Sequence, residues 1–100
     1  MNKAIYYIGL ADKDDKQVHI TIGDAEKKVQ DTIGDCTIHT ATGLYHHING
    51  ARVTEPTLVV IKFDANSKKY HINNCKLLKH IFNQESILLE YTADIDSEFI

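Results

Sequence analysis

A chain of 100 residues with 43% hydrophobic and 25% charged residues has the size and composition of one globular domain. The net charge of −3 and the scattered basic residues argue against nucleic-acid binding. The chain has no run of about 18 apolar residues, so no segment is predicted to cross a membrane. Residues 4–11 are apolar but interrupted by two tyrosines and a glycine, which favours a strand over a secretory signal. We therefore expect a cytoplasmic protein with Cys36 and Cys75 reduced.

Two elements are predicted in the first third of the chain. Residues 4–10 are rich in Ile and Tyr and read as a strand that is apolar on both faces. Residues 22–33 place apolar side chains at helical spacing, after a capping residue at Thr21 and before a glycine at position 34. The sequence therefore predicts a strand followed by a helix.

A hairpin is predicted in the middle of the chain. Residues 36–48 carry β-type residues, and the dipeptide Asn49-Gly50 is typical of a tight hairpin turn. Residues 57–63 form a nearly continuous apolar run, as in a central strand. Pro56 is expected at the beginning of this strand or on an edge, because it has no N–H to donate.

A second helix is predicted from Asn66 or Ser67 to Phe82, with Cys75, Leu78 and Phe82 on its buried side. Residues 86–93 read as the last strand. We predict one α+β domain over residues 1–93 and an acidic C-terminal tail over residues 94–100.

The order strand, helix, strand, strand, helix, strand predicts the ferredoxin-like β-α-β-β-α-β arrangement. Right-handed crossovers place the first and third strands in the middle of a four-stranded antiparallel sheet, with both helices on one face. The other face of the sheet would be left uncovered.

The uncovered face is expected to be apolar, because the middle strands carry apolar residues on both sides. If Val59, Ile61 and Phe63 point at the helices, other side chains point outward. We assign four residues to a homodimer interface on this face: Tyr6, Leu58, Val60 and Leu88. Exposed apolar patches of this kind usually mark interfaces.

Four residues are candidates for ligand binding: His39, Tyr45, His47 and Glu85. The chain has six histidines, but none lies at a spacing typical of a metal site, and no catalytic motif is present. We therefore predict no metal site, no cofactor and no catalytic group. Gly43 suggests a bulge or a close approach inside its strand, and Glu55 is read as part of a surface ion pair with Arg52 or with a histidine of the hairpin.

The segment around Gly43 and Glu55 and the run FNQESI at residues 82–87 resemble a group of small bacterial domains of unknown function. The resemblance covers about the last two-thirds of the chain. It implies the same ferredoxin-like fold and carries no activity with it.

Two functions remain open from the sequence. The first is a non-enzymatic binding protein of bacterial or phage origin that acts as a homodimer, with a further protein as a candidate partner. The alternative is a small dimeric enzyme of the α/β-barrel type, with a ligand between the sheet and the helices. We favour the first, because no catalytic constellation is visible in the sequence.

Overall fold

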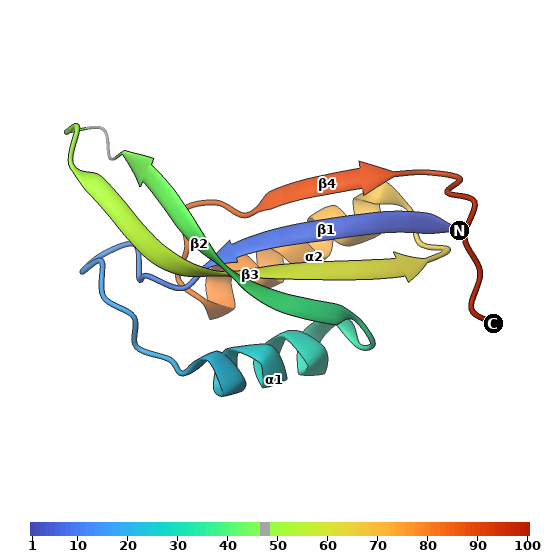
Figure 1. Ribbon diagram of the computed structural model, residues 1–100, viewed down its shortest axis with the longest axis horizontal. Helices are drawn as coiled ribbons and strands as arrows, with labels where there is room; N and C mark the ends of the chain where they lie inside the picture. Colours follow the sequence, from blue (N-terminus) through green and yellow to red (C-terminus); the bar gives the residue numbers. More distant parts are fainter. Residues whose placement is uncertain (47–48) are drawn as a thin grey trace.

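The computed structural model describes residues 1–46 and 49–100. Its four strands pair in the order β2-β3-β1-β4, all antiparallel. The elements in chain order are β1 (Asn2–Gly9), α1 (Ile22–Ile33), β2 (Thr37–His46), β3 (Arg52–Asp64), α2 (Lys68–Ile81) and β4 (Leu88–Thr92). Figure 1 shows the sheet and its two helices. Both ends of the chain lie near the same end of the molecule. The predicted α+β, ferredoxin-like arrangement is confirmed.

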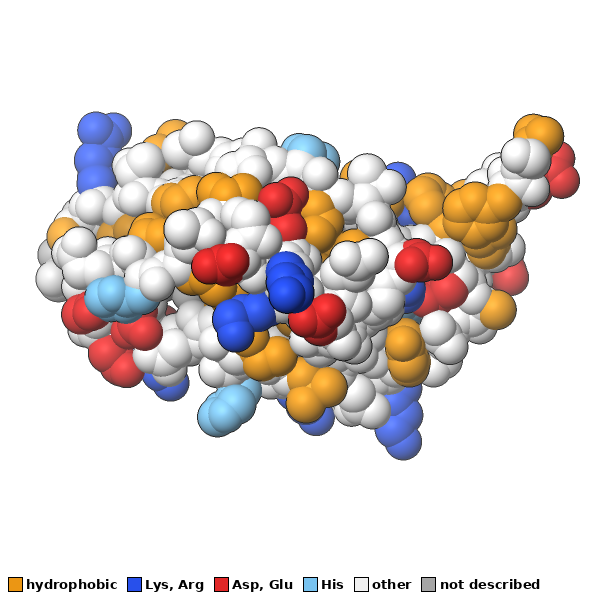
Figure 2. Space-filling model, turned by 90° about the horizontal axis from the view of Figure 1, so that it is seen from below, with side chains coloured by type: hydrophobic (Ala, Val, Ile, Leu, Met, Phe, Trp, Pro, Cys, Tyr) orange, Lys and Arg blue, Asp and Glu red, His pale blue; other side chains and the backbone are white. Residues whose placement is uncertain are grey.

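Helix α1 has the predicted bounds. The hydroxyl of Thr21 accepts a hydrogen bond from the backbone N–H of Asp24 at 3.2 Å, and Gly34 ends the helix with a φ of 80°. Three residues at helical spacing are buried against the sheet: Ala25, Val29 and Ile33. Acidic and basic side chains are interspersed over the outer surface of this side of the molecule, as Figure 2 shows.

Helix α2 begins after Ser67, whose hydroxyl accepts from the N–H of Tyr70 at 3.4 Å. Leu78 and Phe82 are buried, as predicted, although Phe82 directly follows the helix, and Cys75 is only half-buried. The remaining buried positions of the helix are polar: His71 and Asn74. Within the described residues, no helix is long and apolar enough to cross a membrane.

The β2–β3 hairpin is longer than predicted, because β3 starts at Arg52 and includes Pro56. The proline lies opposite Thr42 of β2, at the point where β1 has ended. The carbonyl of Pro56 accepts a hydrogen bond from the N–H of Leu10 at 3.0 Å. Of the two places expected for Pro56, the start of the strand is wrong, because β3 begins at Arg52. The edge position is confirmed, because β1 no longer pairs with β3 at this point and needs no N–H from the proline.

The side chains assigned to the uncovered face were also predicted with the wrong orientation. Tyr6, Leu58 and Val60 have exposed fractions of 0% and pack beneath the helices. Leu88 alone of the four predicted interface residues is outside the core, with an exposed fraction of 63%. The sheet register places Tyr6 opposite Val60 and Ile8 opposite Leu58, so these pairs share the helix side.

The sheet face away from the helices, called the open face below, carries the alternate residues of each strand. The register pairs these residues across the strands, so that they lie on one surface. On β1, β4 and residues 57–64 of β3, the apolar residues of the open face are Ile5, Tyr7, Val59, Ile61, Phe63 and Leu88.

A chain of buried polar groups joins the sheet to α2. Asn74 donates from Nδ2 to the Tyr6 hydroxyl at 3.2 Å, and the same hydroxyl contacts Nδ1 of His71. Nε2 of His71 lies 3.1 Å from Oδ1 of Asp64, at the end of β3. Burial raises the pKa of Tyr6, so its hydroxyl stays protonated and able to donate. The polar positions of α2 are therefore satisfied from the sheet.

Asp64 should make the stability of the fold depend on pH. Burial raises the pKa of Asp64, but hydrogen bonds from Asn66 and His71 outweigh it and lower the pKa below the ordinary 3.8. A lowered pKa in the folded state stabilises the fold above pH 3.8, and this stabilisation is lost as the pH falls through the folded pKa. We expect Asp64→Asn to lower the free energy of unfolding by about 1 kcal/mol at pH 6.

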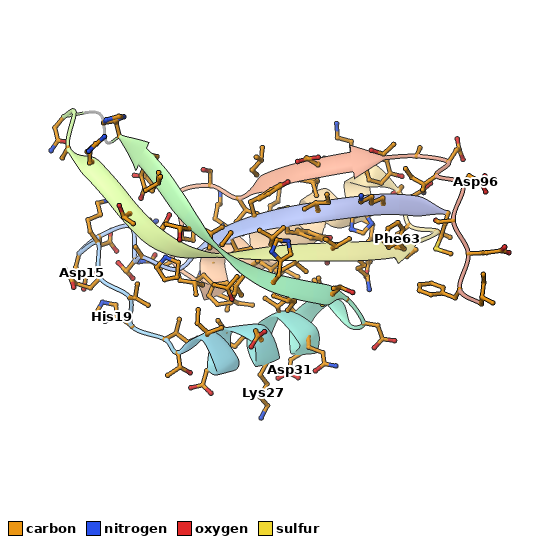
Figure 3. The ribbon with its side chains drawn as sticks, viewed as in Figure 1. Asp15, His19, Lys27, Asp31, Phe63 and Asp96 are labelled. Carbon is orange, nitrogen blue, oxygen red and sulfur yellow. The ribbon has the colours of Figure 1, made fainter. Side chains whose placement is uncertain are left out.

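This prediction is checked by urea denaturation of both proteins from pH 6 to pH 2. The difference between wild type and Asp64→Asn should shrink toward acid. Asp31→Asn is the matched control, since Asp31 points away from the sheet on α1 (Figure 3). A difference that stays constant over the whole range would contradict the assignment.

The C-terminal residues run beside the start of β1. The N–H of Ile95 donates to the carbonyl of Met1 at 2.7 Å, and the N–H of Asp94 donates to Oδ1 of Asn2 at 3.0 Å. Phe99 and Ile100 are exposed. The tail thus lies at the end of the sheet away from the β2–β3 turn (Figure 1).

Candidate functional site

A pocket of about 390 Å³ lies at one end of the open face. It is formed where β1 ends and β4 begins, beside the base of the β2–β3 hairpin. Its lining includes the loop after β1 and the segment between α2 and β4. The side chains on its wall that carry charges or phenol groups are Tyr7, Lys13, Lys16, Tyr45, Glu55 and Glu85.

The carboxyl group of Glu55 is the most enclosed charged group of the pocket. Glu55 has an exposed fraction of only 7%, although it lies on the open face. Its Oε2 accepts a hydrogen bond from the backbone N–H of Ala11 at 2.8 Å. A buried carboxylate needs such donors, because desolvation without them is costly. Glu55 is therefore held in place by the chain that follows β1.

Two glycines make room for Glu55. A Cβ added to Gly9 would lie 2.2 Å from Oε1 and 2.5 Å from Cδ of Glu55. A Cβ added to Gly43 would lie 2.5 Å from Oγ1 of Thr57 and 3.5 Å from Cγ of Glu55. The close approach predicted at Gly43 is thus present. Only residues without a side chain permit the carboxylate to lie flat over the sheet at this point.

Tyr45 lies on β2 on the same side of the sheet and lines the pocket, with an exposed fraction of 40%. Burial raises the pKa of its hydroxyl, and the carboxylates of Glu55 and Glu85 raise it further. The hydroxyl therefore stays protonated at neutral pH and can donate a hydrogen bond to a bound ligand.

Glu85 is positioned by the turn that follows α2. Asn83 adopts a φ of 47°, which ends the helical path. Nε2 of Gln84 then donates to the carbonyl of Ala11 at 2.7 Å, so the segment is tied to the loop after β1. The same residue, Ala11, thus anchors both Glu55 and the segment that carries Glu85.

Tyr7 and Leu88 form an apolar wall of the pocket. They are direct partners in the β1–β4 ladder and both lie on the open face. The Tyr7 hydroxyl donates to Oε1 of Glu90 at 2.6 Å. This hydrogen bond is the main cause of the raised pKa of Tyr7. The ring is thereby fixed beside the pocket with its hydroxyl already engaged.

The structure brings together two of the four predicted ligand-binding residues. Tyr45 and Glu85 line the pocket. His39 lies opposite Val59 on the open face and is not part of the lining, and His47 lies outside the described residues. Among the residues that are described, no group of three His, Cys, Asp or Glu side chains could hold a metal ion.

Glu55 was not predicted as a site residue, and the surface ion pair assigned to it was wrong, because its carboxylate is buried over β1. The sequence feature that could have indicated Glu55 is an acidic residue next to an apolar strand, twelve residues after Gly43. The two lysines of the pocket gave no signal, since their loop reads only as a charged turn. The space between sheet and helices, where the alternative function placed a ligand, is filled by core side chains.

Comparison with known proteins places the fold beside an enzyme. No family model and no curated protein matches the chain. Two solved structures of a phage SAM lyase are similar, one in the apo state and one in complex with S-methyl-5′-thioadenosine. Each superposes with a TM-score of 0.69 at 25% identity and covers 91% of this chain; the overlap spans 78% and 79% of the two lyase chains. This likeness contradicts the predicted non-enzymatic binding protein and favours the enzymatic alternative.

Proposed function

We propose that this protein is an enzyme that cleaves S-adenosylmethionine and releases S-methyl-5′-thioadenosine. The similarity to phage SAM lyase over 91% of the chain carries the proposal. The pocket supports it independently, because it is large enough for a nucleoside-sized ligand and combines aromatic, acidic and basic groups.

The chemistry of the product defines the bond that breaks. S-Methyl-5′-thioadenosine keeps the methyl and adenosyl groups, so the bond between sulfur and Cγ of the amino-acid part is cleaved. A lyase does this without water. The reaction balances if an oxygen of the substrate's own carboxylate attacks Cγ and closes a five-membered lactone. The electron pair of the broken bond goes to sulfur, which becomes a neutral thioether, and no proton is transferred.

This reaction neutralises a carboxylate and a sulfonium ion that are both present in the bound substrate. An environment less polar than water therefore favours the transition state over the substrate. The wall formed by Tyr7 and Leu88 supplies apolar surface. The remaining task of the protein is to fold the flexible amino-acid part so that oxygen and Cγ approach each other.

The acidic groups of the pocket suit the cationic parts of the substrate. S-Adenosylmethionine carries an ammonium and a sulfonium group, and the pocket wall carries the carboxylates of Glu55 and Glu85. Glu55 is the more firmly held of the two, since it is buried and accepts a hydrogen bond from the N–H of Ala11. Burial and the carboxylates of Glu55 and Glu85 raise the pKa of the Tyr45 hydroxyl, so a neutral phenol lies beside these carboxylates.

Incubation of the purified chain with S-adenosylmethionine tests the proposal, with chromatography to detect S-methyl-5′-thioadenosine. Product formation above the uncatalysed rate is expected. The reaction run in ¹⁸O-labelled water separates two routes: direct attack of water on Cγ would label the alcohol oxygen, whereas lactone formation leaves that oxygen unlabelled. Absence of the thioadenosine product at high enzyme concentration would rule out the proposed activity.

Self-association through the open face stays a prediction. With the corrected orientation, the surface that would be covered holds Ile5, Ile61 and Phe63 in place of Tyr6, Leu58 and Val60. Light scattering coupled to size-exclusion chromatography measures the molar mass that decides it. A monomer at high micromolar concentration would contradict it.

A further inference from the structure

The loop between β1 and α1 turns its basic residues toward the pocket. Lys13 and Lys16 both belong to the pocket lining, whereas none of the three aspartates between residues 12 and 15 does. The sequence of this loop, DKDDK, mixes three acidic and two basic residues. The basic residues of this short segment therefore form part of the pocket wall, whereas its acidic residues lie outside the lining.

Each aspartate of the loop has partners away from the pocket. Asp12 and Asp14 accept hydrogen bonds from Nδ2 of Asn83 at 2.8 and 2.9 Å. The hydrogen bond from Asn83 is the main cause of the lowered pKa of Asp12. Asp15 accepts from the N–H of Gln17 at 2.9 Å and pairs with His19, beside which it lies in Figure 3. The aspartate side chains of the loop are therefore engaged outside the pocket lining.

Backbone hydrogen bonds fix the position of the loop. The N–H of Lys13 donates to the carbonyl of Asn83 at 3.0 Å, directly beside the segment that carries Glu85. The N–H of Asp12 donates to Gln17 at 2.8 Å, and the N–H of Lys16 donates to Asp12 at 2.9 Å. The backbone of Lys16 has a φ of 63°, and its ammonium group contacts the carbonyl of Lys13. The two lysines are thus carried by a closed turn at the pocket.

We propose that Lys13 and Lys16 bind the α-carboxylate of the substrate, and so select adenosyl ligands that keep an amino-acid part. The inference rests on the proposed function. The pocket wall has two carboxylates and two ammonium groups, and the amino-acid part of S-adenosylmethionine has two cationic groups and one carboxylate. Glu55 and Glu85 suit the cations, which leaves the basic wall for the carboxylate. The nucleoside part carries no charge that requires the lysines.

Two probes separate this role from a general effect on the pocket. S-Adenosylhomocysteine keeps the carboxylate but has no sulfonium group to cleave, and S-methyl-5′-thioadenosine lacks the whole amino-acid part. Calorimetric titration gives the Kd of each probe for wild type, Lys13→Met, Lys16→Met and the double variant. Lys27→Met is the matched control, because Lys27 projects from α1 away from the sheet (Figure 3).

We expect the double variant to bind S-adenosylhomocysteine about tenfold more weakly than wild type, since each partly exposed ion pair contributes less than about tenfold alone. Its affinity for S-methyl-5′-thioadenosine should stay within about twofold of wild type. In wild type, raising the salt concentration should weaken S-adenosylhomocysteine more than S-methyl-5′-thioadenosine, because the contact is solvent-accessible.

Equal losses for the two probes, or no loss for either, would overturn the role of the lysines while leaving the proposed activity intact. A salt effect identical for both probes would also overturn the role of the lysines. This measurement uses wild type alone, so it does not depend on whether a variant folds. Wild type that binds neither probe and releases no thioadenosine would overturn the proposed function together with this inference. The two failures are therefore distinguishable.

Discussion

Glu55→Gln should lower kcat/KM for S-adenosylmethionine cleavage by about a hundredfold while leaving the fold intact. The glutamine keeps an acceptor for the N–H of Ala11, which Glu55 now binds at 2.8 Å. It removes the negative charge and presents an amide N–H₂ group to a cationic substrate. Losing one partner of a buried charge pair costs about 2–5 kcal/mol, and a hundredfold corresponds to about 2.7 kcal/mol.

The measurement is a steady-state assay of thioadenosine release, accompanied by thermal unfolding of each protein. Glu98→Gln, in the exposed tail, is the control for loss of one carboxylate and should retain wild-type activity. Wild-type kinetics of Glu55→Gln would remove Glu55 from the site. Lost activity with a large drop in the melting temperature would instead assign it a structural role.

Gly9→Ala should have an effect of similar size by a steric route. The new Cβ would stand 2.2 Å from Oε1 of Glu55, so the carboxylate would have to leave its place over β1. We expect about a hundredfold loss of activity and a free energy of unfolding lower by about 2 kcal/mol, as in overpacked sites. Gly23→Ala, where nothing lies within 4 Å of the added Cβ, should keep full activity.

A double-mutant cycle identifies the clash as the cause. In a Glu55→Ala background the obstacle is gone, so adding Gly9→Ala should change the free energy of unfolding by less than about 0.5 kcal/mol. Urea denaturation of the four proteins gives this coupling. If the cost of Gly9→Ala is the same in both backgrounds, the glycine is required for a reason other than Glu55.

The helices could be predicted from local signals, whereas the orientation of the strands could not. Thr21 and Gly34 mark the ends of α1, and the structure follows them. In β1 and β3 both alternating sets of residues are apolar, so periodicity gives no preference for either face. The orientation of Tyr6 is explained by polar residues of another element: His71 and Asn74 of α2 form hydrogen bonds with its hydroxyl.

The site was only half visible in the sequence for a related reason. Tyr45 was predicted because it lies beside the histidines of the hairpin, and Glu85 because it lies at the junction of a helix and a strand; both line the pocket. Glu55 needed Gly9, which lies 46 positions earlier in the chain, and only the β1–β3 register brings them together. Lys13 and Lys16 needed the turn at Asn83. Contacts between residues so far apart in the chain cannot be predicted from the spacing of residues in the sequence.

The hydrogen-bonded chain from Tyr6 through His71 to Asp64 lies on one side of the sheet, and the pocket lies on the other. In β1 and β3, residues that face the helices are therefore constrained by the stability of the fold, whereas the residues between them are constrained by ligand binding. Over evolutionary time, such a division lets substrate preference change through replacements at alternate positions with little cost to the fold, except where a glycine such as Gly9 makes room for Glu55. Variant libraries restricted to the pocket side should accordingly yield a high proportion of well-folded members.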